Sequence, residues 1–405
     1  MTETLRIEVP FCGLPCPGVV LPRDGHELRG GCPVCRDAVA AAFDDDVSAT
    51  PRVGGHPVTL NEAVASAARA LKTARSPFVH GLAWSSVGTA RRAASLAWRV
   101  RGAIDVEGAG AVEADRLALS TFGLASATFG ALRDQADVVL LWRTDPRPTH
   151  PDLLPPRRGL SGTGDGREFI LVPAAGSRRA AKASDATVVV EVPEGGDLAA
   201  LLLLRLLATG RAQAPAGTEM EGAAALLRRA RYTALLWDPT ATACPEGNAI
   251  ASALALLARD LNLSGRAAAR PLGNGGNVAG VTGALASVTG FPRAVGFFSG
   301  EPRMEPETFG APAMFAGGSD RLLLIGTRSA EAHEAAGRVP STVIGPRLLP
   351  GAPEPEIFIP TARAGISAGG LWLRVDGVPV PLRAILPAAR PTEDEVLDRL
   401  AVAVG

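Results

Sequence analysis

The chain lacks an excess of either charge, because its 41 basic residues balance its 41 acidic residues. A general nucleic-acid or anionic-membrane binder normally carries a basic surplus, so neither partner is expected. Lysine is scarce: Lys72 and Lys182 are its only occurrences, and arginine supplies the remaining basic residues. Together with abundant alanine and glycine, this usage is typical of a GC-rich genome and says little about function.

Long apolar runs and targeting signals are also absent. The most apolar helical stretch, around residues 198–207, is interrupted by Arg205. It is far shorter than the roughly 18–20 apolar residues that a membrane span needs. The first residues lack the basic and apolar regions of a signal peptide. We therefore expect a cytoplasmic protein with reduced cysteines, whose clusters would be metal ligands rather than disulfides.

What is present is a globular α/β pattern. The 405 residues are 47% hydrophobic, enough for two or three compact domains. Apolar runs predict strands that alternate with helices, two of which begin at capping boxes, Thr59 to Glu62 and Thr392 to Glu395. Several runs are continuously apolar, as expected of parallel strands covered on both faces. The strands are expected at residues 77–81, 102–105, 137–142, 168–172, 187–192, 233–237, 294–298, 321–326, 342–344 and 356–360.

This pattern predicts an α/β fold with two doubly wound, mostly parallel sheets and a small Cys-rich N-terminal region. We expect the Cys-rich region at residues 1–50, with little helix. One α/β domain would combine residues 51–160 with residues 318–405. A second, inserted α/β domain would take residues 161–317.

Four of the five cysteines form the strongest local motif, Cys12-x3-Cys16 with Cys32-x2-Cys35. Four thiolates in two short-spaced pairs can close a tetrahedral zinc site. A four-cysteine iron–sulfur cluster has the same ligand count, so it remains an alternative. His26 lies within the motif and could replace one cysteine, although a solvated loop histidine is the simpler interpretation.

Other candidate sites give weaker signals. The glycine-rich run at 273–280 could approach a phosphate or serve as a tight turn, and it matches neither a P-loop nor a dinucleotide fingerprint. Asp145, His150 and Asp152 follow an expected strand, a position that lines ligand crevices in parallel sheets. Cys244 stands alone and is expected to be a small buried residue. We assign no catalytic or cofactor-binding residue from these patterns.

Three stretches resemble the B subunit of formylmethanofuran dehydrogenase, a molybdopterin- or tungstopterin-dependent family. ADVVLLWRTDP at 136–146, followed by His150-Pro151, is similar to that family's ADVI…WGxNP…HP. GNVAG at 276–280 and TGFP at 289–292 resemble GxxNVxG and TGYP. GGLWLRVDGVP at 369–379 resembles GTAYRMDGVP and is the most specific of the three. The resemblance runs through the whole chain and implies a fold like that of formate dehydrogenase and other molybdopterin oxidoreductases.

The chain departs from that family where the metal is held. In the family, a helix after Trp-Ser carries Thr-Ser-Cys-Glu, and the cysteine or selenocysteine ligates the metal. Here the stretch after Trp84 places Thr89 at the ligand position and Ala90 in place of the glutamate. An alcohol is a poor ligand beside a thiolate. The histidine of the family's glycine-rich motif is also missing, with Asn274 or Gly275 near its place.

The cysteine pattern departs as well. The family begins Cys-x2-Cys-x3-Cys and adds a distant fourth cysteine. Cys12, Cys16 and Cys32 match, whereas Val9 takes the first position and Cys35 is an addition. Moving one cysteine makes an iron–sulfur pattern more like a zinc knuckle, so the metal site expected at Cys12, Cys16, Cys32 and Cys35 would hold structural zinc.

This combination resembles the beta subunit of the formyltransferase/hydrolase complex of methylotrophic bacteria. The resemblance implies a non-catalytic structural subunit in one-carbon metabolism, in a hetero-oligomer with A, C and D subunits and without molybdopterin. That complex moves formyl groups from formyl-tetrahydromethanopterin to methylofuran on its D subunit and releases formate on its metal-dependent A subunit. Two alternatives stay open. One is a molybdo- or tungstopterin oxidoreductase acting on formyl or formate with Thr89 as metal ligand, and the other is a stand-alone α/β protein that binds a nucleotide-like ligand.

Overall fold

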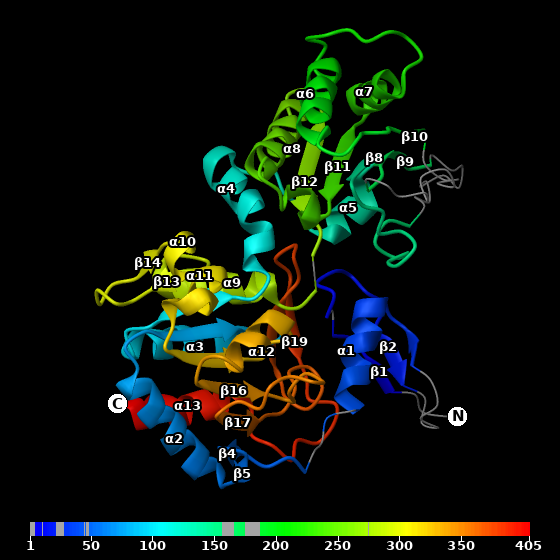
Figure 1. The fold of residues 1–405 in the computed structure, drawn as a ribbon. Coiled ribbons are helices and arrows are strands. Elements are labelled where there is room, and N and C mark those ends of the chain that lie inside the picture. The colour runs from blue at the N-terminus through cyan, green and yellow to red at the C-terminus, as the bar shows by residue number, and fades with distance from the viewer. Residues whose placement is uncertain are drawn as a thin grey trace, which may run out of the picture. The chain divides into compact units, whose positions relative to one another are not determined.

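The computed structural model describes residues 5–9, 11–21, 28–43, 45, 48–155, 166–174, 187–273 and 275–405. The chain divides into two compact units. The first comprises Met1–Gly13, Pro17–Ala109 and Gly275–Gly405, and the second comprises Gly110–Asn274 together with the short segment Leu14–Cys16. Figure 1 shows the elements of both units along the chain.

The first unit is built on a nine-stranded sheet whose five central strands, β7, β6, β15, β16 and β17, are parallel. The strands at both edges pair antiparallel. In their order across the sheet, the strands are β14 (Arg303–Met304), β13 (Val295–Gly296), β7 (Ala103–Val106), β6 (Pro77–Gly81), β15 (Arg321–Ile325), β16 (Ser341–Gly345), β17 (Ile357–Pro360), β4 (Arg52–Val53) and β5 (His56–Pro57).

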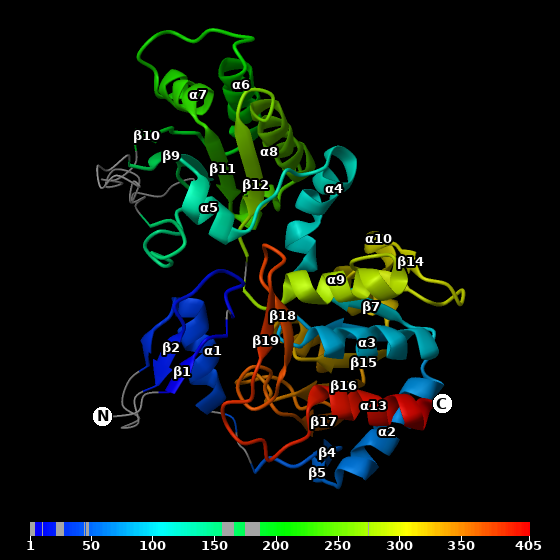
Figure 2. The same cartoon turned by 180° about the vertical axis from the view of Figure 1, so that it is seen from behind.

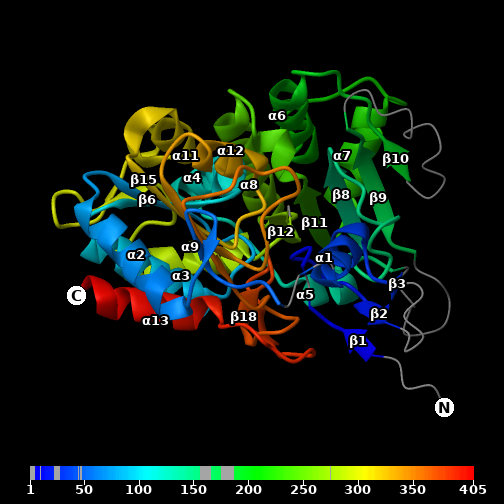
Figure 3. The same cartoon turned by 60° about the horizontal axis from the view of Figure 1, so that its bottom comes forward.

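Helices cover both faces of this sheet, which explains why its central strands are continuously apolar. One face packs against a layer of four helices, seen in Figure 2, with α2 beside α13 also in Figure 3. These helices are α2 (Leu60–Thr73), α3 (Val87–Arg99), α9 (Val278–Thr289) and α13 (Glu393–Val404). The other face packs against α12 (Ala330–Ala336) and the turns α10 (Pro306–Phe309), α11 (Ala311–Ala313) and η4 (Met314–Gly318).

Local sequence determines where the helices begin. The capping box predicted at Thr59 is confirmed: Glu62 N donates to Thr59 Oγ1 over 3.3 Å, and Thr59 N donates to Glu62 Oε2 over 2.8 Å. The box between Thr392 and Glu395 starts α13 in the same way. These reciprocal bonds satisfy backbone donors that lack a partner in the first helical turn.

The second unit contains a five-stranded sheet that is parallel throughout. In spatial order its strands are β10 (Val188–Val189), β9 (Glu168–Val172), β8 (Val138–Trp142), β11 (Tyr232–Trp237) and β12 (Arg266–Pro271). Helices α6 (Asp197–Ala208), α7 (Glu219–Arg229) and α8 (Gly247–Leu261) share a core with the sheet. The described residues between 109 and 242 also form η1 (Ala109–Val112), α4 (Glu113–Phe122), α5 (Phe129–Gln135) and η3 (Pro239–Thr242). The predicted α/β class with mostly parallel sheets is confirmed.

The units divide the chain near residues 110 and 274, whereas the sequence-based boundaries lie at 161 and 317. The difference follows from strand pairing. Strand β8 pairs with β9 and β11, so it belongs to the second sheet, and β13 pairs with β7 of the first sheet. Apolar runs indicate where strands lie and carry no information about their partners.

The N-terminal region contains a short antiparallel sheet of β1 (Leu5–Ile7), β2 (Val19–Leu21) and β3 (Arg29–Gly30). It is followed by the helix α1 (Pro33–Phe43), so the expectation of little helix in this region is wrong. Alanine-rich residues 38–42 favour a helix despite the flanking glycines and prolines. A hairpin of β18 (Gly370–Leu373) and β19 (Pro379–Leu382) lies near the C-terminus. None of the helices in the described ranges is both long and apolar enough to cross a bilayer.

Candidate functional site

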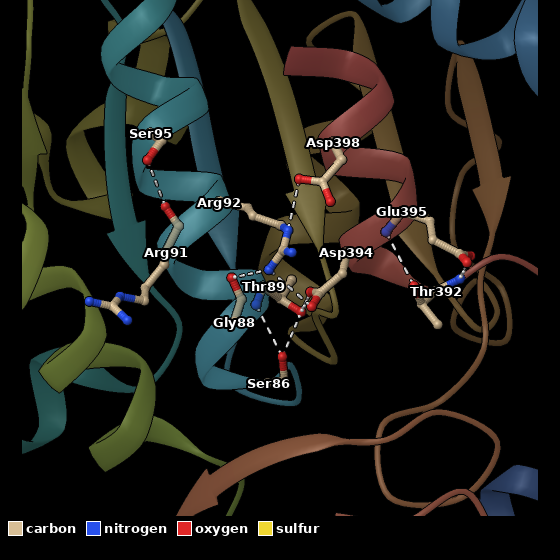
Figure 4. Close-up of polar contacts among 10 residues, drawn as sticks. All are labelled: Ser86, Gly88, Thr89, Arg91, Arg92, Ser95, Thr392, Asp394, Glu395 and Asp398. Carbon is tan, nitrogen blue, oxygen red and sulfur yellow. Dashed lines mark hydrogen bonds and ion pairs between the residues drawn. The ribbon is translucent and has the colours of Figure 1, made fainter. Parts of the chain in front are cut away.

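Thr89, which the motif resemblance aligns with the family's metal-ligand position, lies in the first turn of α3 and is buried. Its backbone N–H donates to the N-cap Ser86 Oγ over 3.0 Å. Its hydroxyl donates a 2.5 Å hydrogen bond to Asp394 Oδ1, at the start of α13. Figure 4 shows these side chains facing one another across the two helix starts. The Thr89 hydroxyl is therefore engaged within the protein itself.

The Asp394 carboxylate also forms an ion pair with the guanidinium of an arginine. Arg92, one turn further along α3, donates from Nη1 to Asp394 Oδ2 over 3.1 Å and from Nε to Asp398 Oδ1 over 2.8 Å. The hydrogen bond to Asp398 is the main cause of the raised pKa of Arg92. Because Asp394 and Asp398 are one turn apart on α13, a single guanidinium joins the two helices (Figure 4).

Beside this contact lies a second carboxyl group, that of Glu393. Its side chain lines a pocket with Ser86, Thr89, Asp394 and residues of the segment 362–369. Burial raises the pKa of Glu393 to about 7, and the neighbouring Asp394 charge adds to the rise, while Arg363 opposes it. Burial disfavours the ionised carboxylate because a buried charge loses its hydration.

The predicted metal ligands do come together. The Sγ atoms of Cys12, Cys16, Cys32 and Cys35 all lie within 4.8 Å of one another, and only Cys16 is not fully buried. Cys32 precedes α1 and Cys35 lies in its first turn, where the helix dipole favours thiolate charge. These four donors form a set that a single metal ion could occupy. His26 lies outside the described residues.

The conformations of two glycines and the packing of Val9 accompany the approach of the four cysteines. Gly13 and Gly31, beside Cys12 and Cys32, have φ angles of +75° and +62°, which side chains other than glycine rarely adopt. A Cβ on Gly365 would lie 2.9 Å from Val9 Cγ2, so the Val9 side chain packs there. The Cys35 thiol reaches the Val9 carbonyl at 3.8 Å. Cys35 thus supplies a fourth sulfur where the family's first cysteine is absent.

The glycine-rich run is used for close packing. The N–H groups of Gly276 and Asn277 donate to the carbonyls of Phe11, at 2.7 Å, and Ala83, at 2.5 Å. A Cβ at Gly276 would lie 2.5 Å from the Ala83 carbonyl oxygen, which explains the glycine. These donors are engaged by the chain, so of the two interpretations the structure favours a tight turn over a phosphate cradle. Asn274 lies outside the described residues.

The strand-end residues of the second unit do not form a catalytic group. Asp145 pairs with Arg147 at 2.8 Å, and His150 Nδ1 lies 3.0 Å from Thr149 Oγ1. Asp152 is exposed. The expectation of a buried Cys244 is wrong: it is exposed between η3 and α8, where its thiol reaches only the local Ala241 carbonyl, at 3.9 Å. A lone cysteine gives no sequence signal for its burial when it lies in a loop.

Sequence reasoning missed Asp394, the residue that engages Thr89. Its only sequence signal was an acidic residue in the first turn of a capped helix, which usually serves the helix dipole. The two residues are 305 positions apart, and no local pattern connects them.

Comparisons with known proteins agree with the motif resemblance. The B subunit of tungsten-containing formylmethanofuran dehydrogenase 2 from Methanococcus maripaludis is 25% identical over 411 residues, covering 95% of this chain and 94% of that protein. The Methanocaldococcus jannaschii protein of the same description is 26% identical over 428 residues, covering 98% and 97%. No protein-family model matches the chain.

The fold comparison points to a related assembly. A chain of the crystal structure of the formyltransferase/hydrolase complex (FhcABCD) from Methylorubrum extorquens, determined with methylofuran, superposes with a TM-score of 0.77. It is 26% identical, and the alignment covers 88% of this chain and 98% of that one. The present chain is thus an α/β protein similar, throughout its length, to the B subunit of formylmethanofuran dehydrogenase. More particularly, it shares its fold with a chain of the formyltransferase/hydrolase complex, as the sequence motifs predict.

Two of these relatives are named as tungsten-containing, so the side chain of Thr89 can be compared with the kind of ligand that such a metal needs. A thiol loses its proton far more readily than an alcohol, which makes thiolate the better metal ligand. An alkoxide at Thr89 would face the Asp394 carboxylate at 2.5 Å, and the like charges would repel. The sequence of α3 contains no cysteine. The residues at the start of α3 therefore do not fit a ligand set for such a metal.

Proposed function

We propose that this chain is a non-catalytic structural subunit of a formyltransferase/hydrolase complex. That complex would move formyl groups from formyl-tetrahydromethanopterin to methylofuran and release formate in one-carbon metabolism. The observation that carries the proposal is the hydrogen bond from Thr89 to Asp394, which engages the position of the redox ligand. The fold shared with a chain of FhcABCD supports the choice of complex.

The proposed partners are the A, C and D subunits of the same complex. By resemblance, transfer takes place on the D subunit and hydrolysis on the A subunit, which leaves this chain to support assembly. A cytoplasmic location belongs to the same proposal. The alternative of a pterin oxidoreductase with Thr89 as ligand is disfavoured by the donor set described above.

The proposal includes a structural zinc ion at Cys12, Cys16, Cys32 and Cys35. A Zn–S bond of about 2.3 Å in a tetrahedron places sulfurs about 3.8 Å apart. The four Sγ atoms lie within 4.8 Å of one another, so a small contraction would complete this geometry. In a four-iron cluster each thiolate binds a different iron, which needs wider spacing. The zinc would close the Cys12–Cys16 turn onto α1 and supply no reaction step.

One purification tests the assignment. The tagged full-length chain is isolated from its own host, the copurifying chains are identified by peptide mass spectrometry, and metals are measured by elemental analysis. We expect three partners with the sequences of the A, C and D subunits, about one zinc per chain from this site, and no stoichiometric molybdenum or tungsten. Stoichiometric molybdenum or tungsten would overturn the structural role.

Activity provides the second readout. The Thr89→Ala complex should produce formate at the wild-type rate, whereas omission of the whole chain should prevent assembly. A large loss of formate production by an assembled Thr89→Ala complex would show that Thr89 takes part in the chemistry.

A further inference from the structure

The solvent face of helix α6 in the second unit is made of apolar side chains. This helix packs between α7 and α8 (Figure 1), and the face that such a helix turns to water normally carries charge. The charged residues of α6 are Asp197 and Arg205, and both bind neighbouring elements. Asp197 accepts hydrogen bonds from Trp142 and Arg143, and Arg205 donates to Asp260 over 2.7 Å. Their side chains are therefore mostly buried, at 14% and 20% exposure.

The exposed residues of α6 form one stripe, called here the α6 stripe, which consists of Ala199, Leu202, Leu203 and Leu206. Its three leucines are 43%, 42% and 42% exposed. Their spacing of three and four residues places them side by side along one face of a helix. Leu201, on the opposite face, is completely buried in the core of the unit. The stripe is therefore not needed by that core, and a contiguous exposed apolar patch of this kind marks an interaction surface.

Charges of opposite sign flank the two ends of the α6 stripe. Glu194 is exposed before the start of α6, and Arg211 is exposed after its end. Glu194 lies eight residues before Leu202, and Arg211 lies eight residues after Leu203. Within the described part of the chain, no ion pair joins the side chain of Glu194 or Arg211 to another residue. The face is thus acidic at one end and basic at the other, at equal sequence distances from its centre.

We propose that the α6 stripe binds the same stripe of a second copy of this chain, with the two α6 helices antiparallel about a two-fold axis. A two-fold interface has to be self-complementary, because the same patch of each copy forms both of its sides. An axis through the midpoint between Leu202 and Leu203 places these leucines against those of the other copy. The same axis sets the small Ala199 opposite the large Leu206, so that the side chains of the two helices can interdigitate.

The charges at the ends of the α6 stripe select this occupant and this direction. In the antiparallel arrangement Glu194 of each copy faces Arg211 of the other, whereas parallel helices would bring like charges together. An anionic membrane is a poorer match, because it would repel the glutamate before the start of α6. The proposal concerns two copies of this chain, so it goes beyond the proposed complex with other subunits and does not rest on it.

Sedimentation velocity tests the dimer on the full-length chain, purified with any partner chains that it retains. Three partly exposed leucines supply less than the roughly 800 Å² that each partner buries in a standard interface, so we expect a dissociation constant of about 1–100 µM. The mass should double as the concentration rises from about 0.5 to 500 µM, a range that spans this constant. Leu203→Glu should weaken the dimer at least tenfold, because the two-fold interface contains the buried charge twice. Leu119→Glu, at a 49% exposed leucine of α4, is the matched control and should dimerise as the wild type does.

Charge reversal provides a second test at exposed positions outside the helix. Glu194→Arg and Arg211→Glu should each weaken the dimer several-fold, because each places like charges opposite one another. The double variant should restore wild-type dimerisation, because the two-fold axis pairs one position with the other. Restoration by the double variant is specific to an antiparallel pair of identical copies.

Thermal unfolding of each variant shows whether it is folded. If Leu203→Glu lacks a cooperative transition, Leu203→Ala replaces it and should weaken the dimer several-fold. The proposal is overturned if the mass of the wild type does not change with concentration, which would leave the α6 stripe to a different partner. It is equally overturned if the folded Leu203 variant dimerises as tightly as the wild type, or if the double charge reversal restores nothing.

Discussion

Asn277 accepts a 2.9 Å hydrogen bond at its side-chain oxygen from the backbone N–H of Leu373. Its amide nitrogen donates to the carbonyl of Ser85, also at 2.9 Å. The side chain is completely buried. One amide therefore joins the glycine-rich segment, the loop before α3 and strand β18. This contact holds together two sequence motifs that lie nearly a hundred residues apart.

Replacing Asn277 with alanine should lower the free energy of unfolding by about 2–4 kcal/mol, because two buried backbone groups lose their partner. Urea denaturation of the full-length chain measures the change. Asn248→Ala, at an exposed position of α8, is the control and should change stability by less than about 0.5 kcal/mol. Equal stability of the two variants would show that Asn277 does not join these segments.

The contact between Thr89 and Asp394 should appear as a coupling energy. A double-mutant cycle with Thr89→Val and Asp394→Ala should give about 1 kcal/mol, the usual contribution of such a hydrogen bond. Asp394 is about one-third exposed, at 34% of its side chain, so a larger value is not expected. A parallel cycle with Thr73→Val, at the exposed end of α2, should give none. Strictly additive effects of the Thr89 and Asp394 changes would contradict the hydrogen bond.

Glu393 should make the chain less stable as the pH rises from 4.5 towards about 7, since burial raises its pKa across that interval. The folded chain then binds more protons than the unfolded chain, so the contribution is complete below 4.5 and is lost as the pH rises through about 7. The loss amounts to about 3 kcal/mol. Glu393→Gln should remove this slope and exceed the wild type in stability at pH 8. Glu334→Gln, exposed on α12, should keep the wild-type slope.

His80 should make the chain more stable as the pH rises, the opposite of the effect expected for Glu393. Burial among aromatic rings lowers its pKa from 6.5 to about 4, so the unfolded chain binds more protons between those values. The stabilising contribution is therefore complete above pH 6.5 and is lost as the pH falls towards about 4. His80→Phe should lose less stability than the wild type between pH 6.5 and 5, as measured by urea denaturation. The exposed control His56→Gln should show the same dependence of stability on pH as the wild type. If His80→Phe showed that same dependence, His80 would not be its cause.

The cysteine cluster should hold metal only when complete. Cys12→Ser and Cys35→Ser should each reduce bound zinc to a small fraction of the wild-type content and lower the melting temperature, because a structural zinc site contributes directly to folding. Cys244→Ser, outside the cluster and exposed, is the matched control and should retain both. Elemental analysis and thermal unfolding are the two readouts. Retained zinc in both cluster variants would rule out this ligand set.

Much of the local architecture is predictable from the sequence. The strands at 77–81 and 168–172 have the predicted bounds. The capping boxes at Thr59 and Thr392 start the helices where expected. These features depend on side chains within about four residues of one another, so local propensity and hydrogen bonding are sufficient to specify them.

The sequence by itself determined the α/β class, the helix starts, the four candidate thiolates and the departure at Thr89. The tertiary structure decided which other residues they contact. It brought Asp394 to Thr89 from 305 positions away and paired β13 with β7. Such contacts depend on which strands become neighbours and which helix faces pack together. The periodicity of a sequence does not indicate strand neighbours or helix-packing faces, because packing between distant segments determines them.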